Sequence, residues 1–154
     1  MLTTEEREEI QQQVTQYPFA RAACIEALKA LQRTRGWIDD ATLAEVARML
    51  DMSVAELDSV ATFYNLIYRQ PVGRHIILLC DSVSCWIVGF HPLHEALRQR
   101  LGIDFGQTTP DERFTLLPIA CLGVCEKAPA MMIDEDLHAP VEIAKLDEIL
   151  AQYE

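Results

Sequence analysis

Two pairs of cysteines are the residues of this chain whose type and spacing could do chemistry. Four residues separate Cys80 from Cys85, and three separate Cys121 from Cys125. Each pair begins at the end of a short apolar run that is typical of a β-strand. Four thiolates from two neighbouring loops are what an iron–sulfur cluster requires, so the pattern predicts a site that carries electrons.

The strands that would position these thiolates span residues 75–80 and 114–121. If the two strands are parallel neighbours, their carboxyl ends lie at the same edge of the sheet, and the loops that follow them are adjacent. We expect each loop to supply two thiolates to one iron of a binuclear cluster. Gly89 and Gly123 are expected to allow backbone conformations that other residues resist, so that the loops can wrap around the cluster.

Two other kinds of site remain open from spacing alone. Zinc also accepts four thiolates, and its loops commonly place two to four residues between paired cysteines. A dithiol oxidoreductase fits less well, because its motif has two residues between the cysteines. The histidines are expected to pack or face solvent, since four cysteines already complete a site; they are His75, His91, His94 and His138.

The fifth cysteine and four aromatic residues of the helical region are expected to be structural. Cys24 lies on the apolar face of a predicted helix and is not expected to be a ligand. Trp37, Phe63, Tyr64 and Tyr68 are expected in a core or an interface. The chain has no glycine-rich nucleotide-binding motif and no recognisable pair of nucleophile and base, so no catalytic residue is assigned. A partner is therefore expected to supply the chemistry.

Residues 1–70 are predicted to form a helical bundle. Capping boxes mark helix starts, Pro18 must follow the end of the first helix, and Gly36 is a plausible stop. The start signals are Thr3 with Glu6, Asp39 or Asp40, and Ser53 with Glu56.

Residues 71–154 change from helical to strand-like periodicity after a Pro-Val-Gly hinge. The expected elements are strands 75–80, 114–121, 130–133 and 137–139, a loop over 81–89, helices over 92–101 and 141–152, and turns over 102–111. Pro118 suggests an edge or a bulge, and Pro129 is a candidate for a cis peptide bond. The predicted fold class is α+β, a helical bundle followed by a thioredoxin-like domain with a small four-stranded mixed sheet.

Composition limits the classes of partner. The chain has 154 residues and a net charge of −11, and both halves carry an excess of acids. A nucleic-acid binder should show a basic face, so none is expected. No stretch has the length of a membrane span, and the acidic N-terminus lacks the character of a signal or transit sequence. A reducing compartment is expected, where paired cysteines favour metal binding over disulfides.

Longer segments resemble one known family. The segments CDSVSCWIVGF and GQTTPDERFTLLPIACLGVCEKAPAMMIDED are similar to the thioredoxin-like [2Fe-2S] subunit of respiratory NADH:quinone oxidoreductase, the E subunit of bacterial complex I. The segments RAACIEALKALQRTRGWIDD and VATFYNLIYRQPVGRH resemble the helical region of that subunit. The resemblance therefore covers most of the chain, and a free-standing ferredoxin of this type would lack the helical extension.

The resemblance implies a non-catalytic electron carrier with one [2Fe-2S] cluster on Cys80, Cys85, Cys121 and Cys125. It implies a flavin- and NADH-binding partner that holds FMN, and a larger iron–sulfur subunit in the same complex. It also implies that the cluster lies near the flavin but outside the main chain of clusters that carries electrons to quinone. The complex would lie in the cytoplasm at the inner face of the bacterial membrane, with no direct insertion of this chain. The equivalent diaphorase subunit of an NAD-linked hydrogenase or formate dehydrogenase is the alternative.

One segment departs from the family pattern. After His138 the family usually continues with Leu-Thr-Pro-Glu, whereas this chain has Ala-Pro-Val-Glu over residues 139–142. The fourth strand and last helix are therefore expected to be shifted or shortened.

Overall fold

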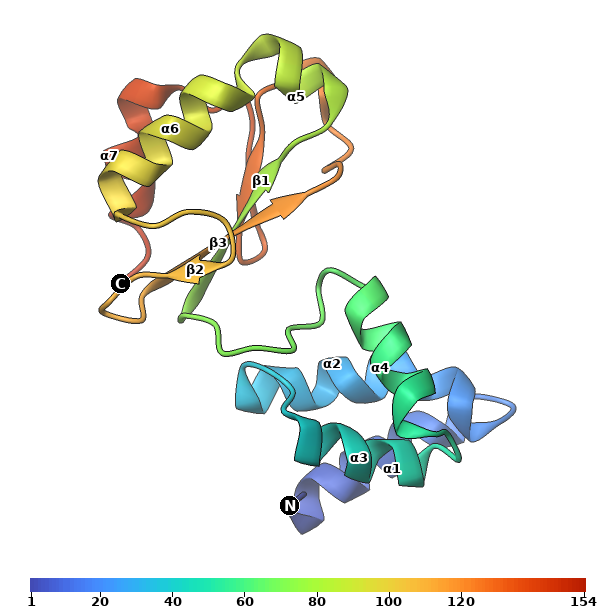
Figure 1. Ribbon diagram of the computed structural model, residues 1–154. Helices are drawn as coiled ribbons and strands as arrows, with labels where there is room; N and C mark the ends of the chain where they lie inside the picture. The colour runs from blue at the N-terminus through green and yellow to red at the C-terminus, as the bar shows by residue number, and fades with distance from the viewer. The chain divides into compact units, whose positions relative to one another are not determined.

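The computed structural model describes all 154 residues, which divide into two compact units, Met1–Pro71 and Val72–Glu154. Each unit contains its own cluster of buried apolar side chains. The first unit is helical, whereas the second combines a sheet with helices (Figure 1). The predicted α+β class is confirmed.

The elements of the first unit are α1 (Thr4–Thr15), the 3₁₀ turn η1 (Ala20–Ala23), α2 (Cys24–Arg35), α3 (Asp40–Met49) and α4 (Val54–Phe63). Both predicted capping boxes are present, at Thr3 and at Ser53. The Asp39 side chain accepts a hydrogen bond from the Thr42 N–H and caps α3. Helix α2 ends at Gly36, where φ is +79°. The sequence signals therefore fix where these helices begin and end.

The core of the first unit consists of apolar residues that recur at helical spacing. Its largest fully buried side chains are Ile10, Leu28, Leu31, Ile38, Leu43, Leu50 and Leu57. Cys24 is half-buried and packs against this core. Phe63 and Tyr64 are 81% and 44% exposed, so a core position is wrong for both and an interface remains a prediction.

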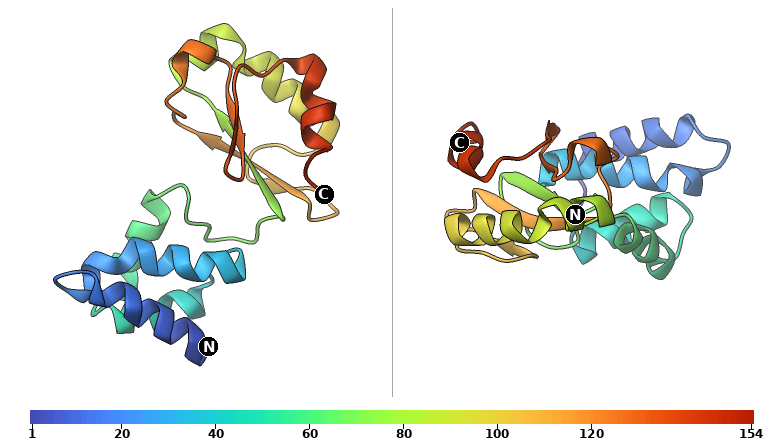
Figure 2. Two further views of the ribbon diagram at one scale, coloured as in Figure 1. Left: turned by 180° about the vertical axis from the view of Figure 1, so that it is seen from behind. Right: turned by 90° about the horizontal axis from the view of Figure 1, so that it is seen from above.

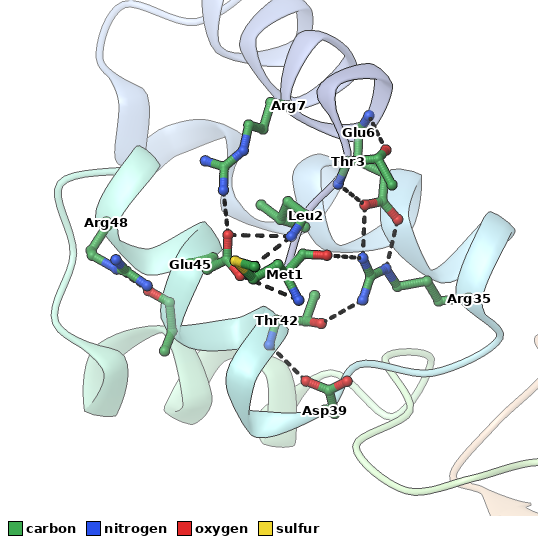
Figure 3. Close-up of polar contacts among 11 residues, drawn as sticks. Met1, Leu2, Thr3, Glu6, Arg7, Arg35, Asp39, Thr42, Glu45 and Arg48 are labelled. Carbon is green, nitrogen blue, oxygen red and sulfur yellow. Dashed lines mark hydrogen bonds and ion pairs between the residues drawn. The ribbon is translucent and has the colours of Figure 1, made fainter.

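Charged groups join α1, α2 and α3 near the start of the chain (Figure 3). Arg35 donates two hydrogen bonds to the Glu6 carboxylate, at 2.6 and 2.7 Å, and a third to the Thr42 hydroxyl at 2.8 Å. The hydrogen bond from Arg35 lowers the pKa of Glu6 from 4.5 to about 2. Glu45 receives hydrogen bonds from the Leu2 N–H and from Arg7. These contacts hold the beginning of α1 against α2 and α3.

The second unit contains a five-stranded mixed sheet. Its elements are β1 (His75–Cys80), α5 (Val83–Val88), α6 (Phe90–Leu101), β2 (Gln107–Thr108), β3 (Phe114–Ile119), η2 (Cys125–Lys127), β4 (Met131–Ile133), β5 (Asp136–His138), η3 (Ile143–Lys145) and α7 (Leu146–Leu150). The strand order is β2-β3-β1-β4-β5. Strands β1 and β3 are parallel, and the other pairs are antiparallel.

The expectation of four strands is corrected by β2, which lies within the predicted turns. It has only two residues, and it pairs with Thr115 and Leu116 of β3. Pro118 lies beyond these two paired residues, so the side of β3 away from β1 is unpaired there. A proline without an N–H fits this position.

The strand predicted over 114–121 ends earlier, at Ile119. The largest differences from the predicted boundaries concern the loop after β1 and the last helix. The predicted loop 81–89 contains α5, a short helix of six residues whose exposed face is apolar and therefore gives no amphipathic pattern. The last helix was predicted over 141–152, but α7 covers only Leu146–Leu150. The Val141 N–H donates a hydrogen bond to the carbonyl of Pro129 at 2.9 Å. Because this bond holds residue 141 against the cysteine loop, the helix begins later in the chain.

Helices α6 and α7 pack on the same face of the sheet (Figure 2). Alternate strand residues point to this face. The buried side chains from the strands are Ile77, Leu79, Phe114, Leu116, Met131 and Ile133. Arg100 of α6 donates to Asp147 of α7 at 2.8 Å. The sheet and these helices share one packed core, and the cysteine loops begin at the edge of this sheet.

Candidate metal centre

The predicted parallel pairing of the two cysteine-bearing strands is confirmed. Cys80, the last residue of β1, is the register partner of Ile119, the last residue of β3. The Asp81 N–H donates to the Ile119 carbonyl at 3.0 Å, which extends the pairing past the end of β1. Both cysteine loops therefore begin at the same edge of the sheet, where α5 lies in Figure 1.

The structure brings the four predicted cysteines together. All are free thiols. Cys85 interacts with Cys80 and with Cys125, and Cys121 interacts with Cys125 and with Cys80. The thiols of the two loops are therefore close enough to influence one another's pKa. Cys24 belongs to the helical unit and takes no part in this group.

The two cysteine pairs differ in their surroundings. Cys80 and Cys85 are each 2% exposed and lie in an apolar cluster with Ala130, whereas Cys121 and Cys125 are exposed. Burial, followed by the hydrogen bond with Cys80, raises the pKa of Cys85 to about 11. The Gly123 N–H, 3.3 Å from the Cys121 Sγ, is the largest cause of a lowered pKa at Cys121. The site thus has one inner and one outer pair of sulfurs.

The two loop glycines have different roles. Gly123 has φ of +78°, in the left-handed region that favours glycine, so the predicted conformational role is confirmed there. It is wrong for Gly89, whose φ of 174° is extended and open to any residue. A Cβ at position 89 would instead lie 3.2 Å from the Cγ of Pro129. The Ala128–Pro129 peptide bond, for which a cis conformation was a candidate, is cis.

The donor set fits a binuclear iron–sulfur cluster. Thiolates are the ligands that such clusters use, with two per iron, and loop N–H groups commonly donate to the sulfurs. Here the Gly123 N–H donates to the Cys121 Sγ at 3.3 Å. No three or more histidine, cysteine or carboxylate side chains are arranged as they would be around a single ion. A binuclear cluster instead needs two pairs of thiolates, with one pair for each iron.

The histidines make contacts elsewhere. His75 bonds Asp134 at 2.7 Å, His94 bonds Asp104 at 3.0 Å, His138 bonds the Tyr153 hydroxyl at 2.9 Å, and His91 packs edge-on against Trp86. These hydrogen bonds and this ring contact agree with the expectation that the histidines take part in structural contacts.

Sequence reasoning missed two features beside the cysteines. The exposed face of α5 carries Val83, Trp86, Ile87 and Val88, with exposed fractions of 52% to 77%. The apolar letters around Cys85 were a signal for this patch, but an apolar run indicates burial more often than exposure. The second feature is Ser82, which precedes α5 in the backbone conformation of a helix cap but makes no capping hydrogen bond.

Comparison with known proteins identifies the class. Residues 10–154 match the family model of the thioredoxin-like [2Fe-2S] ferredoxins, and the chain belongs to this family. Its cofactor is accordingly one [2Fe-2S] cluster, which sets aside the zinc and dithiol alternatives.

Within this class the chain belongs to the family of NADH-quinone oxidoreductase E subunits. It is 49% identical over 152 residues to that subunit of Escherichia coli strain K12, covering 99% of this chain and 92% of the relative. It is 46% identical over 153 residues to the subunit of Pseudomonas aeruginosa, with the same coverage. The helical unit is therefore shared with these relatives, and the chain is an electron carrier.

A solved structure is also similar. Part of an NAD⁺-reducing [NiFe]-hydrogenase in the air-oxidised state matches with a TM-score of 0.68 and 28% identity. The match covers 81% of this chain but only 22% of the hydrogenase chain. In the present chain, no helix combines the length and apolar character needed to cross a membrane.

Proposed function

We propose that this chain is the electron-transfer subunit of an NADH:quinone oxidoreductase and holds its cluster with Cys80, Cys85, Cys121 and Cys125. The observation that carries the ligand assignment is that the parallel register of β1 and β3 makes both cysteine loops begin at one sheet edge. Relatedness over nearly the whole chain supports the assembly. The subunit belongs beside a flavin- and NADH-binding subunit, with a larger iron–sulfur subunit in the same complex.

Each pair of thiolates serves one iron in this proposal. Cys80 and Cys85 hold the inner iron, and Cys121 and Cys125 hold the outer one. The bound cluster stores or passes one electron at a time. The chain itself excludes water from the inner pair and supplies N–H groups to the sulfurs. FMN and NADH bind to the partner, and the complex lies on the cytoplasmic side of the cell membrane.

The exposed patch on α5 supports a protein partner close to the cluster. Trp86 is 52% and Ile87 77% exposed, and both follow directly after Cys85. Contiguous exposed apolar residues commonly mark interaction surfaces, and aromatic residues are enriched there. A partner that covers α5 would bring its own cofactor near the cysteine loops.

Metal and sulfide analysis tests the site. Protein purified without oxygen should contain about two iron atoms and about two acid-labile sulfides per chain. Reduction with dithionite should give the paramagnetic signal of one reduced [2Fe-2S] cluster. Stoichiometric zinc without sulfide would reject the proposal.

Co-expression tests the partner. Ile87→Asp should abolish co-purification with the flavin- and NADH-binding subunit while the cluster content stays unchanged, because a buried charge lacks a partner. Leu137→Asp is the matched control, since Leu137 is 45% exposed but belongs to β5. Equal recovery of the partner with wild type and Ile87→Asp would contradict docking through α5.

A diaphorase subunit of an NAD-linked hydrogenase or formate dehydrogenase is the second candidate. The similarity to part of the hydrogenase favours it, but that match has 28% identity against 49% for the E subunit. The proteins that co-purify with the chain expressed at its natural level distinguish the two. Nickel- or molybdenum-containing subunits would support the second candidate, whereas quinone-reducing membrane subunits would support the first.

A further inference from the structure

A single residue, Gly89, separates α5 from α6. The Gly89 N–H donates to the Cys85 carbonyl at 2.9 Å, and the Gly89 carbonyl accepts from the Leu93 N–H at 3.2 Å. The first bond joins Gly89 to the turn of α5 that carries Cys85, and the second joins it to the first turns of α6. The main chain at Gly89 therefore cannot move without moving Cys85 or α6.

The main chain around Pro129 is also held on both sides. Pro129 lies on the segment that follows the outer cysteines, four residues after Cys125. Its carbonyl accepts a hydrogen bond from the Val141 N–H at 2.9 Å. The carbonyl of the next residue, Ala130, accepts one from the Cys80 N–H at 3.1 Å. These bonds limit how far the proline ring can move without moving a segment that joins two cysteines.

The proline ring occupies the space beside the α-carbon of Gly89. A Cβ at position 89 would lie 3.2 Å from the Cγ, 3.6 Å from the Cδ and 3.8 Å from the Cβ of Pro129. The first of these distances is shorter than the optimal separation of two carbon atoms, about 3.5–4.0 Å. A side chain would therefore push the ring away by a few tenths of an ångström. Because hydrogen bonds hold both main chains, this shift would be passed on to the cysteine segments.

We propose that Gly89 is a positioning residue for the cluster ligands, because its missing side chain lets the turn that carries Cys85 lie close to the segment that follows Cys125. This inference rests on the proposed ligand roles of Cys85 and Cys125. A binding site must hold its ligands to within about 0.5 Å of the productive geometry, so a displacement of a few tenths of an ångström matters. Gly89 is not itself a ligand, and its substitution changes the spacing of the ligands without removing one.

Iron release from the purified subunit tests this role. Wild type and Gly89→Ala are reduced with dithionite and mixed with an excess of the ferrous chelator bathophenanthroline disulfonate. We expect the alanine protein to release iron about tenfold faster, the lower end of the loss in metal affinity that follows when groups orienting the ligands are changed. Electron paramagnetic resonance of the reduced samples should show shifted g values, because these respond to ligand geometry rather than to the stability of the fold.

Gly102→Ala is the matched control. Gly102 has φ of +69° and no atom within 4 Å of an added Cβ, so this substitution strains the backbone of the same unit without creating a contact. It should leave both the rate of iron release and the g values as they are in wild type. Equal rates for Gly89→Ala and Gly102→Ala would overturn the proposal.

A compensating substitution tests the contact itself. Pro129→Ala removes the Cγ and Cδ and leaves a Cβ, whose distance of 3.8 Å from an added Cβ is an ordinary van der Waals contact. In a Pro129→Ala background, Gly89→Ala should change the rate of iron release by less than about twofold, since the two effects are coupled. An increase of about tenfold in both backgrounds would contradict the role of this contact. The comparison with Gly102→Ala decides the question if Pro129→Ala alone retains no cluster.

Failure of this role is distinguishable from failure of the proposed function. A wild-type chain without iron and sulfide would contradict the ligand assignment. A full wild-type cluster that Gly89→Ala leaves unaffected would contradict only the role of Gly89.

Discussion

Cys80 is the register partner of Ile119, and Cys121 follows Ile119 by two residues. The parallel pairing of β1 and β3 therefore decides which cysteines meet, although 41 positions separate Cys80 from Cys121 in the sequence. Moving one strand by a residue would turn its side chains to the other face. The sheet register therefore determines which cysteines can meet in the metal site.

Removal of one thiolate should affect the two units differently. Cys121→Ser should lose most of the bound iron and sulfide, because metal binding and the order of its loops are coupled. The helices of the first unit should persist, since their core contains no residue of the site. Metal analysis and hydrogen exchange of residues 1–71 check both outcomes.

Cys24→Ser is the matched control for that substitution. Cys24 is half-buried in the helical unit, so the variant should keep its full cluster content. Loss of the cluster from Cys24→Ser would show that the ligand assignment is wrong.

The Glu6–Arg35 ion pair should make the helical unit sensitive to acid. The pKa of Glu6 is about 2 in the folded chain, against an ordinary value of 4.5. Its ionised form therefore contributes stability that is complete above about pH 4.5 and is lost as pH falls to about 2. Thermal unfolding followed by circular dichroism should show that the deficit of Glu6→Gln is largest near pH 7 and shrinks below pH 4.5.

Glu5→Gln is the control for that measurement, because Glu5 is exposed on the same turn of α1. It should unfold like wild type across this pH range. A deficit of Glu6→Gln that is the same at pH 7 and at pH 3 would show that the carboxylate charge is not responsible.

Gly73 leaves no room for a side chain. A Cβ there would lie 2.9 Å from the carbonyl oxygen of Glu112, a backbone atom that cannot move alone. We expect Gly73→Ala to destabilise the second unit by about 1–3 kcal/mol. Gly102→Ala, where φ is +69° but no atom lies within 4 Å, should cost about 1 kcal/mol from the backbone conformation alone. Hydrogen exchange of the β1 and β3 amides compares the two, and an equal effect would contradict the steric argument.

The two units are proposed to fold as separate cores, which paired cavity substitutions test. Leu31 and Leu97 are both fully buried, one in each unit. Leu31→Ala should destabilise α1–α4 by about 2–5 kcal/mol, and Leu97→Ala should destabilise the sheet by a similar amount. Hydrogen exchange should rise only in the unit that carries the substitution. A rise in both units from Leu31→Ala would show that the cores are coupled.

Local signals predicted much of the helical unit. The capping boxes at Thr3 and Ser53 and the stop at Gly36 depend on neighbouring residues, so they are readable in a single sequence. Strand β2 depends instead on a partner in β3, and its two residues carry no pattern of their own. The late start of α7 likewise depends on a bond between Val141 and the distant Pro129.

The site was predictable in its ligand candidates but not in its surroundings. Spacing and strand periodicity were enough to bring the four cysteines to one sheet edge. Ser82 stands at the cap position of α5 without making a capping bond, and no sequence pattern distinguishes it from an ordinary helix cap. The exposure of α5 could not be predicted either, because its apolar sequence resembles that of a buried segment.

The contact between Gly89 and Pro129 has a consequence for how the sequence can vary. The two residues lie 40 positions apart, yet a Cβ at position 89 would lie 3.2 Å from the Cγ of the proline ring, which would have to shift by a few tenths of an ångström. A substitution at position 89 is therefore easier to accommodate where residue 129 is smaller or displaced. Across descendants of this chain, we expect changes at these two positions to be correlated.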